Sequence, residues 1–446
     1  METISAISTP YGIGGIAIVR VSGDEAIAIV ERITCPLQNV PGYTVRHAYL
    51  HRGKETLDEV LVTVFRAPHS FTGEDVVEIA CHGSLYIQQT VLQWLIEEGA
   101  RLAHPGEFTQ RAFLNAKMDL TQAEAVADLI AAQTQAEKDL ALKQLRGGVS
   151  SELANLRERL LHITSLIELE LDFADHEELE FADRSELKAL ATEIQSKLKA
   201  LIASFRTGNA IKNGITVAIA GPTNAGKSTL LNALLGEERA IVSNIHGTTR
   251  DTIEDTLVID GVLFRFIDTA GIRETADQIE ALGIERSRKA IEKAQIVILV
   301  QDLSSHEESV SWDFVKQNPD TKIIYVWNKT DLVHPSLPNP KQEALLHVCL
   351  SAKNGEVDQL KQLLLQAAQE FTQHNGTIIS NTRHYEALIR SLDAIERVQQ
   401  GLENNISGEF LSMDLQDCLN ALGEITGQIT SQEVLNNIFA KFCIGK

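Results

Sequence analysis

The residues that most clearly could do chemistry are Gly-Pro-Thr-Asn-Ala-Gly-Lys-Ser at 221–228, which fit the phosphate-binding pattern G-x-x-x-x-G-K-[ST]. The apolar run 215–220 predicts a buried parallel strand before them, and 229–235 predict the first turns of a helix after them. The glycines allow backbone N–H groups to point at phosphate oxygens, and the helix N-terminus adds a positive dipole end. We expect Lys227 to reach the β- and γ-phosphates and the Ser228 hydroxyl to hold Mg²⁺. A glycine-rich turn with a chance lysine is the weaker interpretation, because the strand and helix flank it.

Two further motifs predict which base is bound. Asn328-Lys329-Thr330-Asp331 follows a predicted strand at 323–327, and Ser351-Ala352-Lys353 follows one at 348–350. The two carboxylate oxygens of Asp331 suit the two adjacent N–H donors of guanine, a pair that adenine lacks. The serine motif would place a backbone N–H near the guanine oxygen. These motifs therefore favour GTP over ATP.

The expected γ-phosphate side of the site has two motifs. Asp268-Thr269-Ala270-Gly271 follows a predicted strand at 263–267, with its aspartate near Mg²⁺ and its glycine sensing the γ-phosphate. Within Gly-Thr-Thr-Arg-Asp at 247–251, Thr249 is the candidate to close over Mg²⁺ and the phosphate, and the alternative is a helix-capping cluster. Ras-like GTPases use a glutamine after the first motif, but Ile272 stands here and cannot orient a water molecule. The candidates for that role are Arg273, Glu274, Asp277 and Glu280. The alternative is that each is an ordinary solvated charge in a loop.

Composition limits the remaining possibilities. The chain has 446 residues, enough for about three domains, and a formal net charge of −21. That charge argues against a broad basic nucleic-acid surface, so an RNA contact would need a local patch or a partner protein. Five scattered cysteines without a C-x-x-C pair fit a reducing cytosol, and no apolar run or signal-peptide layout suggests a membrane. We therefore expect a cytoplasmic protein.

The distribution of apolar, helix-favouring and turn residues along the sequence predicts four segments. Residues 1–117 read as an α+β domain, with strands at 15–21, 60–65 and 75–80 and helices at 24–33 and 84–98, the first capped by Ser22 or Asp24. Residues 118–210 and 373–446 read as two parts of one helical domain. That domain is interrupted by a doubly wound α/β nucleotide-binding domain at 211–372.

For two other features we favour a structural interpretation over a functional one. The acidic run 168–186 could hold a metal ion, but a solvated helix end is the stronger interpretation, since no histidine pattern supports ligation. Cys81 beside His82 could suggest a nucleophile pair, but adjacent strand residues point to opposite faces, so we interpret Cys81 as packing.

With these motifs in place, the chain resembles the MnmE (TrmE) family of bacterial tRNA-modification GTPases along its full length. The phosphate, switch and Asp-Thr-Ala-Gly-Ile-Arg motifs all match, and three motifs outside the nucleotide-binding domain separate this family from other GTPases. These three are Phe71-Thr72-Gly73-Glu74-Asp75, Arg111-Ala112-Phe113-Leu114-Asn115 and Cys443-Ile444-Gly445-Lys446.

The resemblance implies a homodimer whose N-terminal domain binds a tetrahydrofolate derivative, in the 5-formyl or methylene form. It implies a heterotetramer with an FAD-dependent MnmG-type partner, which adds a carboxymethylaminomethyl or aminomethyl group to the wobble uridine of certain tRNAs. It also implies hydrolysis that depends on K⁺ as well as Mg²⁺, with Glu280 orienting the attacking water.

The resemblance assigns site residues as follows. The implied K⁺ ligands are Asn224, Ser243, Ile245 and Thr248, the Mg²⁺ ligands are Ser228 and Thr249, and the folate ligands are Arg20, Glu78, Lys117 and Lys446. The candidate GTP-binding residues are Asn224, Ala225, Gly226, Lys227, Ser228, Thr229, Ser243, Asn244, Ile245, His246, Gly247, Thr248, Thr249, Asp268, Thr269, Ala270, Gly271, Asn328, Lys329, Asp331, Ser351, Ala352 and Lys353.

The C-terminal residues leave several interpretations open. From the sequence alone, Arg20 would end a strand as a surface charge, and a tail beyond 440 would be frayed. Cys443 is fourth from the end, where the cysteine of a C-a-a-X prenylation signal would lie, but the residues after it do not fit that signal. A buried structural thiol is a stronger alternative to a functional one. The resemblance instead points to a functional, catalytic thiol near the folate.

Three functions are compatible with these patterns. The first is a GTP-driven tRNA-modification enzyme. The second is a regulatory GTPase of ribosome assembly, which the acidic helical flanks disfavour because such proteins usually have an attached basic RNA-binding domain. The third is a folate-dependent aminomethyl transferase with an appended GTP switch, which differs from the first only in its substrate.

Overall fold

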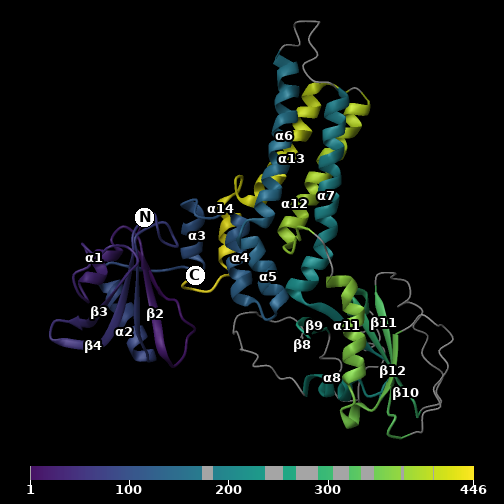
Figure 1. The fold of residues 1–446 in the computed structure, drawn as a ribbon, viewed down its shortest axis with the longest axis horizontal. Coiled ribbons are helices and arrows are strands. Elements are labelled where there is room, and N and C mark those ends of the chain that lie inside the picture. The colour runs from purple at the N-terminus through teal and green to yellow at the C-terminus, as the bar shows by residue number, and fades with distance from the viewer. Residues whose placement is uncertain are drawn as a thin grey trace. The chain divides into compact units, whose positions relative to one another are not determined.

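The computed structural model of the chain describes residues 2–172, 184–236, 255–267, 290–304, 321–332, 346–372, 376–404 and 406–446. The chain divides into two compact units, one made of residues 1–131, 141–195 and 387–446, the other of 132–140 and 196–386. Each unit contains one six-stranded sheet together with helices, and Figure 1 labels many of these elements. The protein is thus multidomain, with mixed sheets and many helices.

The first unit begins with a sheet of strand order β3-β4-β5-β2-β1-β6, antiparallel except for the β1–β6 pair. Apolar side chains at alternate positions of β2, such as Ala17, Val19 and Val21, pack in one core with α1 and α2. The expected strands and helices are present here. The strands are β1 Ile4–Ile7, β2 Gly14–Ser22, β3 Thr44–Arg52, β4 Glu55–Phe65, β5 Val76–Gly83 and β6 Arg101–Leu102, and the helices are α1 Ala26–Glu31 and α2 Leu85–Glu97.

The expected cap of the first helix is wrong. The residue before α1 is Glu25, whose side chain makes no capping hydrogen bond, so neither Ser22 nor Asp24 begins the helix. The Ser22 hydroxyl is instead 2.8 Å from the Thr72 hydroxyl and donates to Glu74 at 2.7 Å. The Ser22 hydroxyl therefore makes its hydrogen bonds with residues about fifty positions away in the sequence and does not cap α1.

Long helices make up the rest of the first unit. Leu153, Leu156, Leu160, Ile163 and Ile167 are all buried, which confirms the helical spacing predicted for that stretch. Gly147, with φ +85°, separates α5 from α6. The remaining helices with residues in this unit are α3 Glu107–Leu114, α4 Leu120–Ala131, α5 Gln135–Leu145, α6 Gly148–Asp172, α7 Arg184–Asn213, α12 Thr382–Glu403, α13 Gly408–Thr426 and α14 Gln432–Phe439.

Helices from both sides of the nucleotide-binding segment pack together in this unit. Gln195 on α7, which precedes that segment, donates to Glu396 on α12, which follows it, at 3.0 Å. Among the helices that follow it, Arg397 on α12 donates to Asp414 on α13 at 2.5 Å. The first contact is partly buried and the second is an exposed ion pair, which adds little stability, so the buried apolar stripes hold the bundle. Among the described residues, no helix is long and apolar enough to cross a membrane.

The second unit contains a sheet of order β12-β11-β10-β7-β9-β8, parallel except for the β8–β9 pair. Both faces of this sheet are covered, as a doubly wound fold requires, so its central strands are almost entirely apolar. Its strands are β7 Ile215–Ala220, β8 Asp255–Ile259, β9 Val262–Phe266, β10 Ile296–Asp302, β11 Lys322–Asn328 and β12 Leu346–Leu350, and its helices include α8 Lys227–Gly236 and α11 Asp358–Thr372.

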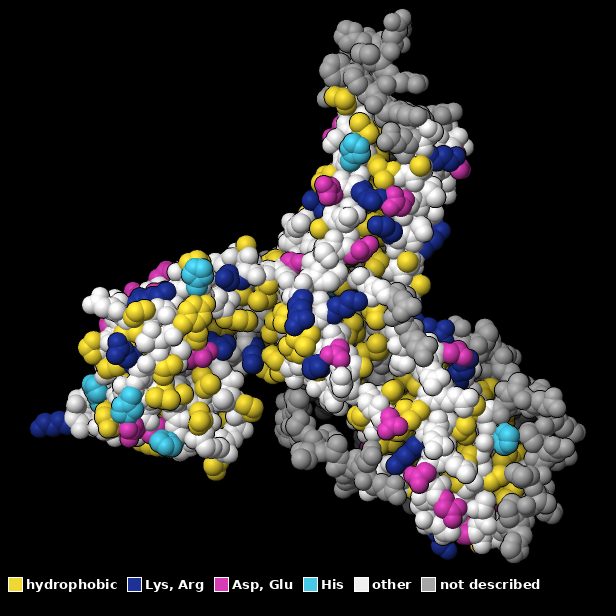
Figure 2. Space-filling view, viewed as in Figure 1, with side chains coloured by type: hydrophobic (Ala, Val, Ile, Leu, Met, Phe, Trp, Pro, Cys, Tyr) yellow, Lys and Arg dark blue, Asp and Glu magenta, His cyan; other side chains and the backbone are white. Residues whose placement is uncertain are grey.

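The surface fits the acidic composition. On the face drawn in Figure 2, the Lys and Arg side chains of the described residues are scattered among acidic and hydrophobic ones and do not form one broad patch. The net charge of −21 had already argued against a continuous basic surface.

Candidate functional site

The phosphate loop has the shape that its sequence predicts. It leaves the carboxyl end of β7 and enters α8, which begins at Lys227, two residues earlier than expected. A Cβ on Gly221 would lie 2.2 Å from the Val300 carbonyl oxygen, and one on Gly226 would lie 2.2 Å from the Asn328 side-chain nitrogen. Both glycines also have positive φ angles, so only glycine fits these two positions.

Lys227 is ready to receive an anion. Its ammonium group donates to the carbonyl oxygens of Gly221 at 2.9 Å and Pro222 at 2.8 Å, curled over the loop that it follows. Burial lowers the pKa of this ammonium group, because the surroundings disfavour its charge. A phosphate bound at the N-terminus of α8 would supply the missing negative charge.

The base-site motifs meet at the same edge of the sheet, because β7, β10, β11 and β12 are parallel neighbours. The Asn328 side chain is buried and donates to the Ala225 carbonyl oxygen at 2.9 Å, while it accepts from the Ala352 N–H at 3.0 Å. This one amide therefore ties the phosphate loop to the Ser351-Ala352-Lys353 loop. Removing it would leave a buried carbonyl and a buried N–H without this partner.

Asp331 is exposed and held in place on one side. Its Oδ1 atom accepts a hydrogen bond from the Ser351 hydroxyl at 2.7 Å. The remaining lone pairs of the carboxylate can accept from two N–H donors on a flat ring. The two motifs that the sequence assigned to guanine are thus brought together, although they lie twenty residues apart.

Several expected site residues lie outside the described residues. These are the switch and cation candidates Ser243, Asn244, Ile245, His246, Gly247, Thr248 and Thr249, the motif Asp268-Thr269-Ala270-Gly271, and the water-orienting candidates with Glu280. Most of the acidic run 168–186 also lies there. In the parts of the chain that are described, no group of His, Cys, Asp and Glu side chains could hold a metal ion.

A second group of polar residues lies on the N-terminal sheet. Arg20 on β2 and Glu78 on β5 are directly opposite each other, and the Arg20 Nε donates to Glu78 Oε1 at 2.8 Å. The guanidinium carbon lies 5.8 Å from the Phe71 ring centre and 5.6 Å from that of Phe108. Arg20 is therefore a partly buried, paired charge two residues before the end of β2, and the expectation of a surface charge that ends the strand is wrong.

The C-terminal tail lies against this domain. The Gly106 N–H donates to the Cys443 carbonyl oxygen at 3.4 Å, and the Phe108 N–H donates to that of Lys446 at 3.2 Å. The Gly445 carbonyl oxygen accepts from the Ser8 hydroxyl at 3.3 Å and from Arg20 at 3.4 Å. The interpretation of a frayed tail is therefore wrong.

Gly445 is required for this docking. It has φ +92°, and a Cβ there would lie 2.5 Å from the Ile7 carbonyl oxygen. The docked tail places the backbone of Lys446 against the N-terminal domain, which contains Arg20. Lys117, on the loop after α3, donates to the Pro68 carbonyl oxygen at 2.9 Å. Of the four folate candidates, the structure joins Arg20 and Glu78 directly and places the tail next to them.

The two cysteines of interest differ sharply. Cys443 is exposed, so the interpretation of a buried structural thiol is wrong for it. Cys81 is buried in the sheet core, where burial raises the pKa of its thiol to about 11, and its neighbour His82 points to solvent. Cys81 is thus a packing residue, as its strand position predicted.

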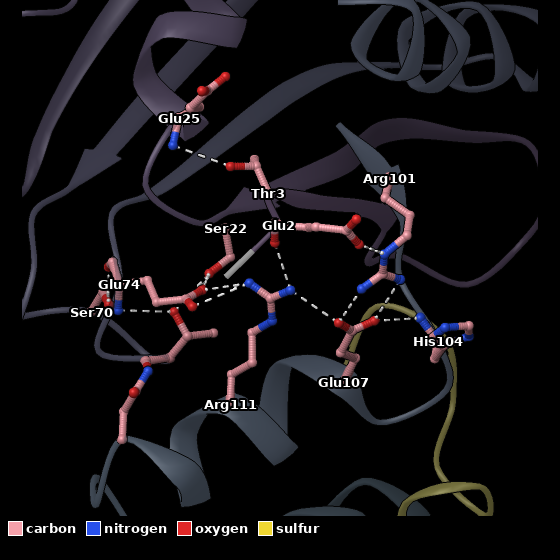
Figure 3. Close-up of polar contacts among 12 residues, drawn as sticks. Glu2, Thr3, Ser22, Glu25, Ser70, Glu74, Arg101, His104, Glu107 and Arg111 are labelled. Carbon is pink, nitrogen blue, oxygen red and sulfur yellow. Dashed lines mark hydrogen bonds and ion pairs between the residues drawn. The ribbon is translucent and has the colours of Figure 1, made fainter. Parts of the chain in front are cut away.

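Arg111 is the centre of a buried ion network that no local sequence pattern predicts. Figure 3 shows Arg111 between two carboxylates, with hydrogen bonds of 3.0 Å to Glu74 and 3.0 Å to Glu107. Asn115 also donates to the Thr72 carbonyl oxygen at 2.7 Å. In the sequence the motifs Phe71–Asp75 and Arg111–Asn115 are family signatures without a local structural signal, and these contacts show that they pack against each other.

The network is electrostatically complete. Burial works to raise the pKa of Glu107, but hydrogen bonds from Arg101, the His104 N–H and Arg111 outweigh it and hold that pKa at about 2. Arg111 is almost fully buried, which is tolerated only because the carboxylates neutralise it. The network fixes α3 and the Phe71 loop, which carry the two rings beside Arg20.

Two family models match the chain. The model described as the GTP-binding protein TrmE N-terminus matches residues 3–117, and the model of the MnmE helical domain matches residues 120–443. Together they span nearly the whole chain, including the nucleotide-binding segment.

Full-length relatives carry one common name, tRNA modification GTPase MnmE. The chain is 55% identical over 461 residues to the protein of Parabacteroides distasonis, with all of both chains covered. It is 52% identical over 464 residues to that of Bacteroides thetaiotaomicron and 48% identical over 462 residues to that of Flavobacterium psychrophilum, with 100% of this chain and 99% of each relative covered. A solved structure of Era in complex with MgGDPNP and a segment of 16S ribosomal RNA aligns with 40% of this chain and 66% of its own, at 28% identity and a TM-score of 0.26. A TM-score that low supports no conclusion.

Proposed function

This chain belongs to the MnmE family of tRNA modification GTPases, and we propose that it couples GTP hydrolysis to a change at the wobble uridine of certain tRNAs. It is a GTP hydrolase, which converts GTP to GDP and phosphate in tRNA modification. The proposed product carries a carboxymethylaminomethyl or aminomethyl group at carbon 5 of that uridine. The observation that carries this function is the full-length identity to the family's named members.

The nucleotide site supports the GTPase part. Lys227 lies at the start of α8 beside the phosphate loop, and Asp331 lies three residues after the end of β11 with one oxygen held by Ser351. We assign Lys227 to the phosphates, Ser228 to Mg²⁺ and Asp331 to the guanine base. The Mg²⁺ ion would offset the charge of the phosphate oxygens, while these side chains orient the nucleotide.

We assign the folate site to Arg20, Glu78, Lys117 and Lys446. The tetrahydrofolate derivative, when bound, supplies the one-carbon unit. Arg20 suits a ligand carboxylate and Glu78 suits adjacent N–H donors, but the two now hydrogen-bond each other. A ligand would therefore bind between them or share Arg20, whose guanidinium the Phe71 and Phe108 rings keep in place.

The family also suggests the assembly in which this chain works. We propose a cytoplasmic homodimer that joins an FAD-dependent MnmG-type partner in a heterotetramer and acts on tRNA. The proposed domains are an N-terminal folate-binding and dimerisation domain at 1–117, a helical domain at 118–210 and 373–446, and a GTPase domain at 211–372. In the first unit, segments 141–195 and 387–446 lie together, which supports a single interrupted helical domain.

Hydrolysis is expected to be faster in K⁺ than in Na⁺ at equal ionic strength, by about tenfold or more. The reason is Asn224, whose exposed side chain stands in the phosphate loop where a monovalent ion could offset developing charge, while Ile272 cannot orient water. Asn224→Ala should lose the K⁺ stimulation, and Glu280→Ala should lose turnover but keep its GTP affinity. Phosphate release from purified protein in the two salts is the measurement, and equal rates would refute the role of the cation.

A further inference from the structure

Asp302 ends β10 at the edge of the sheet where the nucleotide site lies. In the parallel ladder between β10 and β11 it is directly opposite Asn328, the first residue of the Asn-Lys-Thr-Asp motif. The Leu303 N–H donates to the Asn328 carbonyl oxygen at 3.0 Å, so the chain after Asp302 continues along that motif. No motif in the sequence singled Asp302 out.

Both oxygens of the Asp302 carboxylate have partners. Oδ2 accepts from the Lys329 ammonium at 2.5 Å, and Oδ1 accepts from the Ser304 N–H at 2.9 Å and from its hydroxyl at 2.6 Å. Burial works to raise the pKa of Asp302, but the hydrogen bonds from Lys329 and Ser304 outweigh it and hold the pKa below its usual range. Asp302 is 17% exposed and Lys329 28%, so solvent screens this pair less than an open surface pair.

The backbone of Lys329 is in an unusual conformation. Its φ angle is +70°, in the left-handed region that a residue with a side chain seldom adopts. The surrounding contacts must hold such a conformation, because a residue with a Cβ is less stable there than in the right-handed region. Asp331 follows two residues later, so the direction of this turn decides where its carboxylate points.

We propose that Asp302 is a positioning residue for the nucleotide base: it anchors the Lys329 side chain and so holds the left-handed turn that presents Asp331 to guanine. This rests on the proposed GTP site, in which Asp331 binds the base. In this proposal Asp302 acts through Lys329 and does not itself contact the nucleotide. Ser351, on the loop after β12, also holds Asp331, because its hydroxyl donates to the Asp331 carboxylate.

The test is Asp302→Asn in the full-length protein, with binding of GDP and IDP measured by titration calorimetry. Asparagine keeps an acceptor for Ser304 but lacks the charge that holds Lys329. The dissociation constant for GDP should rise about tenfold. The preference for GDP over IDP, which lacks the exocyclic amine that Asp331 is proposed to bind, should shrink several-fold, and Asp302→Glu should restore part of it.

Two controls separate positioning from stability. Glu370→Gln removes the partner of Lys322, which lies at the opposite end of β11, and should leave both dissociation constants unchanged. In a Lys329→Met background, Asp302→Asn should add no further loss, because the anchored group is already gone. Asp302→Asn protein that is folded and keeps the wild-type GDP-to-IDP preference would overturn the proposal.

The wild-type protein tests the site on which this inference rests. If it binds GDP no better than ADP, the base-site assignment itself fails. If it prefers GDP and the Asp302→Asn variant keeps the wild-type preference, only the role of Asp302 fails.

Discussion

Replacing Asp331 with asparagine is expected to weaken GTP binding by about 2–4 kcal/mol and to raise the affinity for xanthosine triphosphate. The substitution exchanges one acceptor oxygen for an NH₂ donor that faces the N–H donors of guanine. Xanthine has a carbonyl oxygen where guanine has its exocyclic amine, so the new donor finds a partner there. Competition of the two triphosphates against a fluorescent GDP analogue is the measurement.

The surroundings of Asp331 make this experiment clean. In the described part of the chain, the one hydrogen bond observed to the Asp331 carboxylate comes from the Ser351 hydroxyl, which lies 2.7 Å from Oδ1. An asparagine oxygen can keep that bond. Asp358→Asn, which changes a carboxylate at the start of α11 in the same unit, is a matched control and should bind GTP as the wild type does. If Asp331→Asn also binds GTP as the wild type does, the guanine assignment is wrong.

Deleting residues 443–446 is expected to abolish the tRNA product while folding and GTP hydrolysis survive. Three tail carbonyl oxygens, those of Cys443, Gly445 and Lys446, accept hydrogen bonds from the N-terminal domain, and the phosphate loop belongs to the other unit. Deletion would therefore remove one partner of Arg20 and weaken folate binding. Nucleoside analysis of tRNA from cells carrying the truncated chain, with the GTPase rate of the purified protein, is the measurement.

Point substitutions separate the backbone of the tail from its thiol. Gly445→Ala should behave like the deletion, since its Cβ would lie 2.5 Å from the Ile7 carbonyl oxygen. Cys443→Ser should cost little stability because the side chain is exposed, so a loss of modification would assign a chemical role to the thiol. Normal wobble-uridine modification in the truncated strain would exclude the tail from the mechanism.

The nucleotide site was predictable where its information is local. The residues 215–235 combine a continuous apolar run, a glycine-rich turn and a helix, and the structure has β7, the loop and α8 there. The β11 and β12 motifs could be placed as well, because carboxyl ends of neighbouring parallel strands meet at one edge of a sheet. The observed boundaries differ from the expected ones by one or two residues: α8 begins at Lys227, β11 at Lys322 and β12 at Leu346.

The N-terminal site was predictable only through the resemblance. Arg20 meets Glu78 because β2 and β5 pair in one register, and no local pattern joins two residues 58 positions apart. For the same reason Ser22 was assigned to a helix cap, although its hydroxyl contacts Thr72 and Glu74. Asp302 was missed because a single acidic residue at the end of a strand has no signal of its own.

The buried charges show the same limit. Arg111 is an ordinary helical arginine by its sequence, and a solvated charge would be the default interpretation. The two carboxylates that neutralise it come from a loop 37 residues away and from the previous turn of its own helix. Tertiary packing therefore decides its burial, and the sequence of α3 alone could not.

We propose above all that this chain uses GTP hydrolysis to modify the wobble uridine of tRNA. The most direct test of this proposal is mass-spectrometric analysis of the tRNA nucleosides of a strain that lacks the chain, with and without the wild-type protein or Asp331→Asn supplied in trans. We predict that the carboxymethylaminomethyl or aminomethyl uridine disappears in the deletion strain, returns with the wild type and does not return with Asp331→Asn. A deletion strain whose wobble uridines remain fully modified, above all one that instead accumulates immature ribosomal subunits, would contradict the account.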